Sequence, residues 1–289
     1  MEIQNSFLHS GNAGDVLASL PAMREFYRKT GIKPILYLRK GVKAFYYEGA
    51  VHPVKNSGGE SVMLNDNMIK MLMPLLKAQP FLEDVREWTD EEIGTDLDNI
   101  RETNVGMPGM SINRWYFYVY PDLACDLTKQ WMEVSDSDKD LAKGKVIITR
   151  TERYTNPNID YAFLKPYEDD LIFSGTMREY NIFCMTYDLN IRKLTVNNFL
   201  DLAQAIKQSR FHMTNQTMAN QISTGLLHPC ILEVCTFAPN CIVFGEDRYD
   251  FMAQKALEYY FNLLYKKPPN KGGFAIDKSQ VDQPNAVAI

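Results

Sequence analysis

The sequence predicts an α/β protein with two doubly wound, Rossmann-like domains that face a central cleft. Two patterns carry this prediction. In the first half, a strand at 2–8, a helix at 15–30 and a buried strand at 34–38 follow one another as a βαβ unit. In the second half, strands at 145–150 and 170–175 flank a polar loop and begin the same pattern again. At 289 residues the chain is also long for a single core, which favours two domains.

The rest of the first half contains a helix, a strand and an irregular stretch. Apolar residues at helical spacing (Ile69, Met71, Leu72, Leu75, Leu76) predict a helix over 67–79, and a strand follows at 85–88. Residues 106–122 combine turn formers (Gly106, Met107, Pro108, Gly109) with the aromatic run Asn113-Arg114-Trp115-Tyr116-Phe117-Tyr118. This composition suits a loop that lines a sugar or another ring-shaped ligand, and it suits a hydrophobic core segment equally well.

The polar, acidic run at 135–140 has no apolar periodicity and is the expected linker between domains. The predicted domains are therefore 1–140 and 141–267, with a loosely ordered tail at 268–289 rich in Pro, Gly, Asn and Lys. The second domain continues with a helix at 198–209, a strand at 211–214 and a helix opening at 215–217. A strand at 231–235 and a closing helix at 251–265 complete it.

Composition excludes several classes of protein. A formal net charge of -5 and a pI near 5.5 oppose binding to nucleic acid mainly through phosphate neutralisation. The five cysteines form no Cys-x-x-Cys pair and the four histidines are scattered, so we expect reduced thiols and no metal site. Neither a signal peptide nor an apolar stretch approaching 18 residues is visible. These features predict a soluble, cytoplasmic protein without a membrane span.

The first βα junction places an acid in a glycine-rich turn. Ser10, Gly11, Ala13 and Gly14 allow a tight turn, and Asp15 falls at the start of the following helix. An anion there is favoured by roughly 0.3–1 kcal/mol, so Asp15 is either a simple helix cap or a functional acid at the rim of the cleft.

Ligands of doubly wound domains bind outside the carboxyl ends of the strands, and three loops of the second half fall there. The loop at 149–156 follows a strand and carries Thr149, Arg150, Thr151 and Arg153. Two guanidinium groups among hydroxyls suit a diphosphate, the alternative being a solvated loop with surface arginines.

For each of the other two loops, the alternative to ligand binding is an ordinary role at the start of a helix. Gly175 ends a strand and Glu179 follows four residues later, where it could accept hydrogen bonds from a ribose or merely start a helix. Asn215, Gln216 and Thr217 follow a strand and open a helix, so they could meet a phosphate, or Asn215 could simply cap the helix.

These motifs, in this order, resemble those of the heptosyltransferase-like glycosyltransferases, family nine, which have the GT-B fold. Gly14-Asp15-Val16-Leu17 followed by Leu20-Pro21-Ala22 is similar to the family's N-terminal signature, whose aspartate is its proposed general base. The resemblance covers most of residues 3–265. It implies that the loop at 149–157 binds the donor's phosphates and that Phe173-Ser174-Gly175 with Glu179 forms the nucleotide-binding turn.

The chain departs from the family at its third loop. Asn215-Gln216-Thr217 stands where the family usually has Asp-Thr-Gly, and Asn220 stands where it often has a histidine. These departures put the donor sugar in doubt, and with it whether this part of the site is still active.

The expected function is therefore inverting transfer of a sugar from a nucleotide sugar to an acceptor hydroxyl, with Asp15 as general base. The donor would contact Thr149, Arg150, Thr151, Arg153, Gly175, Glu179, Asn215, Gln216, Thr217 and Asn220. Asn12, Trp115 and Tyr116 would contact a glycan, lipid-linked or other acceptor, and no metal or cofactor is expected to be needed. Two alternatives remain: a phage-type glycosyltransferase acting on modified DNA bases, which makes nucleic acid a partner only as acceptor, and a noncatalytic sugar-nucleotide-binding or scaffold protein.

Overall fold

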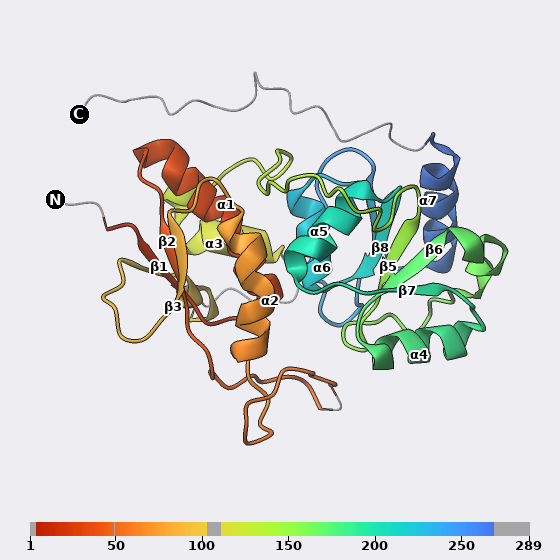
Figure 1. Ribbon diagram of the computed structural model, residues 1–289, viewed down its shortest axis with the longest axis horizontal. Coiled ribbons are helices and arrows are strands. Elements are labelled where there is room, and N and C mark those ends of the chain that lie inside the picture. The colour runs from red at the N-terminus through yellow and green to blue at the C-terminus, as the bar shows by residue number, and fades with distance from the viewer. Residues whose placement is uncertain (1–3, 49, 103–110, 269–289) are drawn as a thin grey trace.

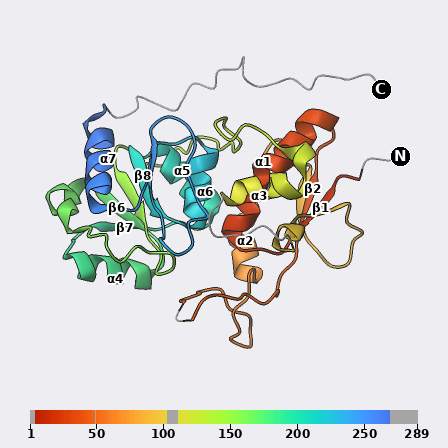
Figure 2. The same ribbon diagram turned by 180° about the vertical axis from the view of Figure 1, so that it is seen from behind.

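The computed structural model describes residues 4–48, 50–102 and 111–268, and its chain forms two parallel sheets in two lobes (Figure 1, Figure 2). The predicted tail and the predicted turn at 106–109 lie outside the described residues, apart from Pro268. The first sheet has the order β3-β2-β1-β4. Its strands are β1 (Ser6–His9), β2 (Ile35–Leu38), β3 (Asp84–Glu87) and β4 (Thr95–Asp96).

The second sheet has the order β10-β9-β8-β5-β6-β7 and every pair in it is parallel. Read from β7, this is the strand order 3-2-1-4-5-6 of the dinucleotide-binding fold. Successive strands are added on one side of β5 up to β7 and on its other side from β8 onward, so the topological switch point lies between β5 and β8. Its strands are β5 (Val146–Thr149), β6 (Leu171–Ser174), β7 (Arg192–Leu194), β8 (Phe211–Asn215), β9 (Cys230–Glu233) and β10 (Arg248–Phe251).

Helices connect the strands and cover the sheets. The α-helices are α1 (Ala13–Thr30), α2 (Asp66–Lys77), α3 (Ile112–Val119), α4 (Met177–Tyr187), α5 (Phe199–Gln208), α6 (Met218–Gly225) and α7 (Gln254–Lys266). Short 3₁₀ helices lie at Leu97–Arg101 (η1), Pro121–Leu123 (η2) and Ala162–Asp170 (η3). In Figure 1, α1 and α2 face α5 and α6 between the sheets, whereas α4 and α7 lie on the far side of the second sheet.

Side-chain alternation explains why the second sheet is covered on both faces. Val146 and Ile148 of β5 point into a core that contains Phe261 of α7, whereas Ile147 points into the core on the opposite side. All three are buried, as is typical of parallel strands between two helical layers. Near-continuous apolar runs of this kind are the signal that made the inner strands predictable.

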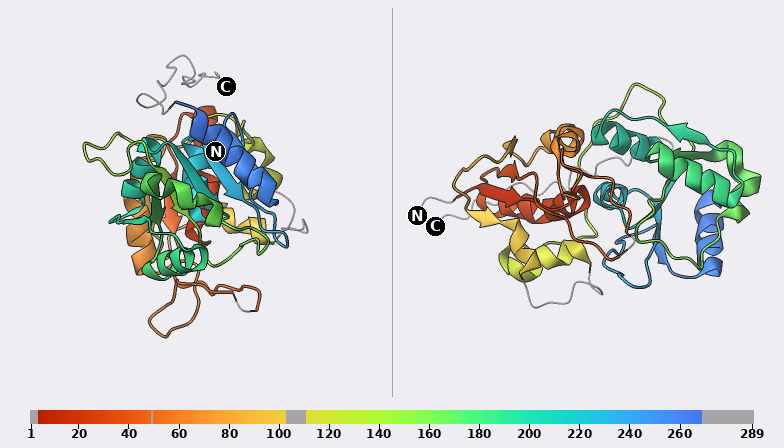
Figure 3. Two further views of the ribbon diagram at one scale, coloured as in Figure 1. Left: turned by 90° about the vertical axis from the view of Figure 1, so that its right-hand side faces the viewer. Right: turned by 90° about the horizontal axis from the view of Figure 1, so that it is seen from below.

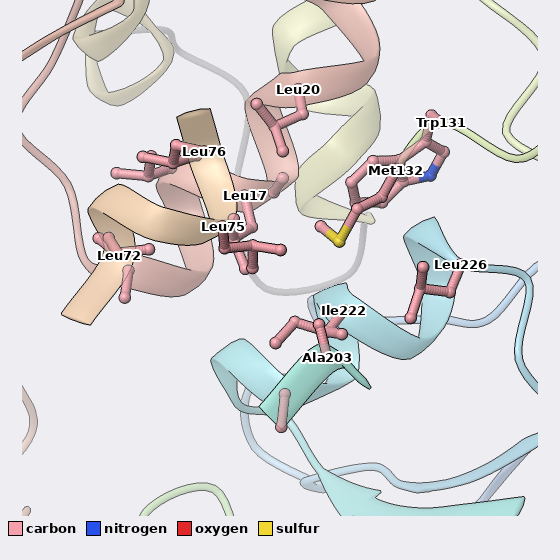
Figure 4. Close-up of a cluster of buried hydrophobic side chains, with 14 of the residues drawn as sticks. Leu17, Leu20, Leu72, Leu75, Leu76, Trp131, Met132, Ala203, Ile222 and Leu226 are labelled. Carbon is pink, nitrogen blue, oxygen red and sulfur yellow. The ribbon is translucent and has the colours of Figure 1, made fainter. Parts of the chain in front are cut away.

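The two domains share one apolar core. Leu17 and Leu20 of α1 and Leu75 of α2 lie close to Ile222 of α6 and Ala203 of α5, with Trp131 and Met132 closing the cluster (Figure 4). Figure 3 shows the same junction from below, where the helices of the two lobes meet. At this interface the amino ends of α1 and α6 are in contact: Gly14 of α1 lies against Met218 of α6.

The helix α3 and the strands β4, β7 and β10 differ from the sequence-based expectation. The segment 112–119 is the helix α3 rather than an irregular loop, since its apolar side chains fall on one helical face and pack against α1. Neither β4 nor β7 has an apolar run, because β4 has two residues and β7 is the edge strand Arg192-Lys193-Leu194, in which only Leu194 is buried. The strand β10, at the other edge, was also not predicted.

Candidate functional site

A cavity of about 600 Å³ lies between the two domains, at the carboxyl ends of both sheets. Its walls come from the β1–α1 junction and α2 on one side, and from the loops after β5, β6, β7 and β8 on the other. Among the residues predicted for the site, it is lined by Asn12, Asp15, Thr149, Thr151, Arg153, Gly175, Glu179, Gln216 and Thr217. It is not lined by Arg150, Asn215, Asn220, Trp115 or Tyr116.

Asp15 is the third residue of α1, and its carboxylate is held in one orientation. Oδ2 accepts a hydrogen bond from the Asn12 backbone N–H at 3.1 Å and one from Arg101 Nη2 at 2.6 Å. Oδ1 accepts no hydrogen bond from a described residue, and the side chain is 18% exposed. Asp15 therefore fulfils part of the capping role expected of it while keeping one oxygen available at the cavity.

A hydrogen-bonded network fixes Arg101. Its second nitrogen, Nη1, lies 2.8 Å from Asp98, whose carboxylate also accepts from the Ser10 backbone N–H. Burial alone would raise the pKa of Asp98, but His9, Ser10 and Arg101 outweigh burial and hold that pKa below its usual value. Asp98 is therefore an anion that anchors the guanidinium beside Asp15.

His9 and Tyr116 extend the same hydrogen-bonded network to the backbone at Asp15. Burial lowers the pKa of His9. Because Gly11 N–H donates to Nδ1 at 2.9 Å, the proton of the neutral ring sits on Nε2. That nitrogen lies 2.7 Å from the Tyr116 hydroxyl, which in turn donates to the Asp15 carbonyl at 2.9 Å. Tyr116 thus secures the backbone at Asp15 rather than a ligand.

The expectation that Trp115 and Tyr116 pack against an acceptor is corrected by their burial. They are 2% and 0% exposed and belong to the core of the first domain, so the core alternative describes them. Both lie on the inner side of α3, where packing against α1 takes up their apolar surface. Asn12 does line the cavity, although its side-chain oxygen already accepts from the Tyr46 hydroxyl at 2.7 Å.

Arg150 is not available to a donor. Its Nε and Nη2 lie 2.7 and 3.0 Å from the two oxygens of Glu233, which is fully buried. Glu233 also accepts from the Tyr161 hydroxyl at 2.8 Å. A buried carboxylate needs such partners, so the first arginine of the loop neutralises Glu233 inside the domain.

Arg153 is the cation that the loop presents to the cavity. Its guanidinium carbon lies 4.6 Å from the ring centre of Tyr46, a residue of the other domain, and 5.7 Å from that of Tyr154. Its Nη1 is buried and has no hydrogen-bond partner among the described residues. Thr149 and Thr151 lie beside it on the cavity wall. A guanidinium that is oriented by aromatic rings, and whose Nη1 has no partner among the described residues, is suited to an anionic oxygen.

The third loop is largely occupied by internal contacts. Asn215 Nδ2 donates to the carbonyls of Thr151 and Arg153 at 3.1 and 2.8 Å, and its Oδ1 accepts from Thr151 N–H. Asn215 therefore shapes the 149–156 loop, and it is not the cap of α6. That cap is Thr217, whose hydroxyl accepts from Ala219 N–H at 3.1 Å.

Gln216 and Asn220 differ in their surroundings. Gln216 lines the cavity, but its amide is bonded to the loop around Ala238 and to the Cys235 N–H. Asn220 is fully buried away from the cavity, and neither of its amide atoms has a hydrogen-bond partner among the described residues. The structure provides no account of that unpaired amide.

Glu179 lines the cavity but also closes a capping box at the start of α4. Its Oε2 accepts from the backbone N–H and the hydroxyl of Thr176 at 2.8 and 2.9 Å, and the Thr176 hydroxyl accepts from Glu179 N–H. Gly175 is required here by space, because a Cβ on it would lie 2.8 Å from Phe173 and 3.0 Å from the Glu179 carboxylate.

Sequence patterns missed several residues of the site, most clearly Arg101 and Tyr46. Arg101 is 86 positions from Asp15, and no motif near it signals that the two meet. Tyr46 comes from the long loop between β2 and α2, which has no helical or strand period. Lys193, a second cation on the cavity wall, lies on the unpredicted edge strand β7.

Within the described residues, no group of three or more His, Cys, Asp or Glu side chains could hold a metal ion. The helices of that part of the chain are all too short or too polar to cross a membrane.

Comparisons with known proteins find structural relatives only. No protein-family model and no curated protein matches the sequence. Among solved structures, the family 9 glycosyl transferase of Veillonella parvula has a TM-score of 0.58 at 9% identity, covering 94% of this chain and 93% of its own. The E. coli ADP-heptose lps heptosyltransferase II also has a TM-score of 0.58, at 10% identity, with 91% and 98% covered.

A third structure, the E. coli heptosyltransferase WaaC with ADP-2-deoxy-2-fluoro heptose, has a TM-score of 0.54 at 9% identity and covers 89% of this chain and 98% of its own. These likenesses extend over both domains. They confirm the fold that the sequence predicted: the chain has the GT-B fold of the family 9 glycosyltransferases and heptosyltransferases.

Proposed function

We propose that this protein is an inverting glycosyltransferase that uses a nucleoside-diphosphate sugar. The observation that carries the proposal is that one interdomain cavity is lined both by Asp15 and by Arg153. Among the described residues, Asp15 Oδ1 accepts no hydrogen bond and Arg153 Nη1 has no hydrogen-bond partner. The first suits a base for an acceptor hydroxyl, and the second suits a diphosphate leaving group.

The proposed reaction uses these groups in one displacement. Asp15 Oδ1 takes the proton of the acceptor hydroxyl while that oxygen forms a bond to the anomeric carbon. The bond from that carbon to the donor phosphate breaks on the opposite face, which inverts the configuration. The departing diphosphate carries the electron pair away, and Arg153 with the amino end of α6 at Thr217 stabilises its charge.

The structural relatives support the donor class. Heptosyltransferase II is named for ADP-heptose, and WaaC was solved with a fluorinated ADP-heptose and with ADP. By this proposal Glu179, in the first turn of α4 after β6, faces the ribose side of the donor. The proposal includes transfer without a metal ion, since Arg153 and Lys193 supply positive charge on the donor side of the cavity. It also places the protein in the cytoplasm, where its five unpaired cysteines would stay reduced.

A noncatalytic sugar-nucleotide-binding protein is the second candidate. It is favoured by Arg150 and Asn215, two predicted donor residues that are tied into internal contacts. A transfer or donor-hydrolysis assay separates the two, because only the enzyme turns the donor over.

Donor binding is tested by the melting temperature of the protein with ADP, GDP and UDP in the presence of EDTA. A ligand at 100 times its Kd stabilises the native state by about 2.7 kcal/mol. We expect at least one nucleotide to raise the melting temperature of the wild type, and Arg153→Ala to reduce that rise. Arg192→Ala is the matched control, since Arg192 is exposed on β7 and does not line the cavity. If no nucleotide stabilises the wild type, the donor site is assigned wrongly.

A further inference from the structure

Three aromatic rings from three separate loops meet where the two domains face each other. Tyr47 comes from the β2–α2 loop, Tyr154 from the loop after β5 and Phe237 from the loop after β9. The ring centres of Tyr47 and Phe237 are 5.0 Å apart, and those of Tyr154 lie 6.2 Å from Tyr47 and 6.4 Å from Phe237. We call these three residues the aromatic platform.

The platform connects the protein surface to the cavity. Tyr47 is 43% and Phe237 53% exposed, whereas Tyr154 is partly buried and lines the cavity that also contains Asp15. Tyr154 adopts a left-handed backbone conformation with φ of 53°, which a tyrosine rarely takes. Single exposed aromatic residues are common on protein surfaces, but a cluster of three beside a functional cavity indicates a binding surface.

The first-domain side of the cavity carries little charge. None of its described lining residues is a lysine or an arginine, and Asp15 is paired with Arg101. His52 lines the same side, and burial lowers its pKa, so it adds no cation at neutral pH. The cation next to the platform is Arg153 of the second domain, 5.7 Å from the ring centre of Tyr154, and the proposed donor diphosphate uses it. The first-domain lining residues therefore add no counter-charge for a phosphorylated acceptor or a nucleic acid backbone.

Side-chain amides complete the surroundings. Asn12, Asn67 and Asn240 line the cavity, and their side-chain nitrogens donate no hydrogen bond to any described residue. Amide donors in a cavity that Tyr154 of the platform also lines suit a ligand with both an apolar face and hydroxyl groups. A lipid chain would cover the rings but would leave the amides unpaired.

We propose that the aromatic platform binds the acceptor and that the acceptor is an uncharged glycan or glycoside, one of whose sugar rings packs its C–H face on Tyr47 and Phe237. This inference rests on the proposed function, in which the acceptor hydroxyl reaches Asp15. Tyr154, the platform residue that lines the cavity, then contacts the acceptor on the side of Asp15, and the amides bind the hydroxyls at the edge of the sugar.

The test uses saturation-transfer NMR with the methyl glycosides of glucose, galactose, mannose and N-acetylglucosamine, and with glucose 6-phosphate. We expect wild-type protein to bind at least one methyl glycoside, with the strongest transfer to the C–H protons of one ring face. Phe237→Ala and Tyr47→Ala should weaken that binding at least fivefold, and Phe237→Tyr should retain it. Tyr259→Ala is the matched control, since Tyr259 is 63% exposed on α7, outside the cavity.

The nucleotide stabilisation described above is measured on the same variants, so that the two proposals can fail separately. If nucleotides stabilise the wild type but no methyl glycoside binds, or glycoside binding is unchanged in both alanine variants, the platform is assigned wrongly. Tighter binding of glucose 6-phosphate than of every methyl glycoside would overturn the neutral acceptor. Loss of nucleotide stabilisation in Tyr47→Ala and Phe237→Ala would show that the rings hold the domains together instead. A wild type that binds a glycoside but no nucleotide would contradict the proposed donor.

Discussion

Arg101 Nη2 lies 2.6 Å from Oδ2 of Asp15, across a separation of 86 residues. The contact joins the end of the 3₁₀ helix η1 to the start of α1, and Asp98 anchors the same guanidinium from the other side at 2.8 Å. Asp98 thus fixes Arg101, and Arg101 fixes the carboxylate of Asp15, which lines the cavity. No described residue donates a hydrogen bond to the other oxygen, Oδ1. In the proposed reaction Arg101 is a positioning residue, since it acts through Asp15.

Replacing Arg101 tests this positioning role. We expect Arg101→Ala to lower kcat by about tenfold or more, because a misplaced base loses much of its effect, while nucleotide-induced stabilisation stays unchanged. Arg101→Lys, which keeps a cation near Asp15, should recover part of kcat. Steady-state kinetics on folded variants provide the measurement, and an unchanged kcat in Arg101→Ala would remove the role.

Asp15→Asn removes the base but keeps an oxygen that can accept from Asn12 N–H and Arg101. A positioned base contributes about 10²–10⁴-fold, so turnover should fall by about 10²-fold or more. The fold and the nucleotide-induced rise in melting temperature should be preserved. Turnover within a few-fold of the wild type would leave Asp15 with a structural role at the helix start only.

The two arginines of the donor loop should behave differently. Arg150→Met leaves the buried carboxylate of Glu233 without its main partner, and breaking such a pair costs about 3–5 kcal/mol. Below its melting temperature this variant should still bind nucleotide, unlike Arg153→Ala. Chemical denaturation gives the stability, and the combined change Arg150→Met with Glu233→Leu should recover part of the loss. A stable Arg150→Met variant that has lost nucleotide binding would restore Arg150 to the donor site.

Two aromatic residues of α3 allow a matched comparison of core and surface. Trp115→Ala should lower the free energy of unfolding by about 3–5 kcal/mol, since a large buried side chain leaves a cavity behind. Tyr118→Ala, on the same helix but with its side chain 56% exposed, should change it by about 0.5 kcal/mol or less. Denaturant titration measures the free energy of unfolding of both variants, and equal values would contradict the placement of Trp115 in the core.

Two buried histidines should make the second domain sensitive to acid. Burial lowers the pKa of both His212 and His228 to about 3, from an ordinary value of 6.5. Between these values the unfolded chain binds more protons than the native one, so stability is fully present above about pH 6.5 and falls as the pH falls toward 3. From pH 7.5 to pH 5 each histidine should account for a loss of about 2 kcal/mol.

The matching variant is His212→Gln, which removes one of these titrations. In the wild type, His212 Nε2 lies 3.0 Å from the Thr149 hydroxyl and Nδ1 lies 2.5 Å from the Ser223 hydroxyl. The amide of a glutamine can retain one of these contacts. The unfolding free energy of this variant should depend less steeply on pH over the same range. An equal slope in wild type and variant would show that His212 is not buried in its neutral form.

Local patterns were sufficient for the inner framework and for part of the site. The strands β1, β2, β5, β6, β8 and β9 are short apolar runs, and the helices α1, α2, α5 and α7 show an apolar period, so each could be predicted from neighbouring residues. Parallel strands put their carboxyl ends at one edge, and for that reason Asp15, Thr149, Thr151, Arg153 and Glu179 were predicted to converge. The edge strand β3 was predicted at 85–88, but the edge strands β4, β7 and β10 and the helix α3 were missed. Edge strands need no apolar run, and an aromatic helix of eight residues resembles an aromatic loop.

Residue periods and the geometry of βα units are enough to predict the two-domain α/β fold, the interdomain position of the site and the acid at its rim. Which side chains are free to act depends on how the folded chain packs. Arg150 and Arg153 have the same chemistry in one loop, yet Arg150 is bound by the buried Glu233 and Arg153 faces the cavity. Likewise, Arg101 reaches Asp15 and Trp115 fills the core only through packing between distant segments. These partners cannot be predicted from neighbouring residues in the sequence, because burial and charge pairing depend on where the rest of the chain lies.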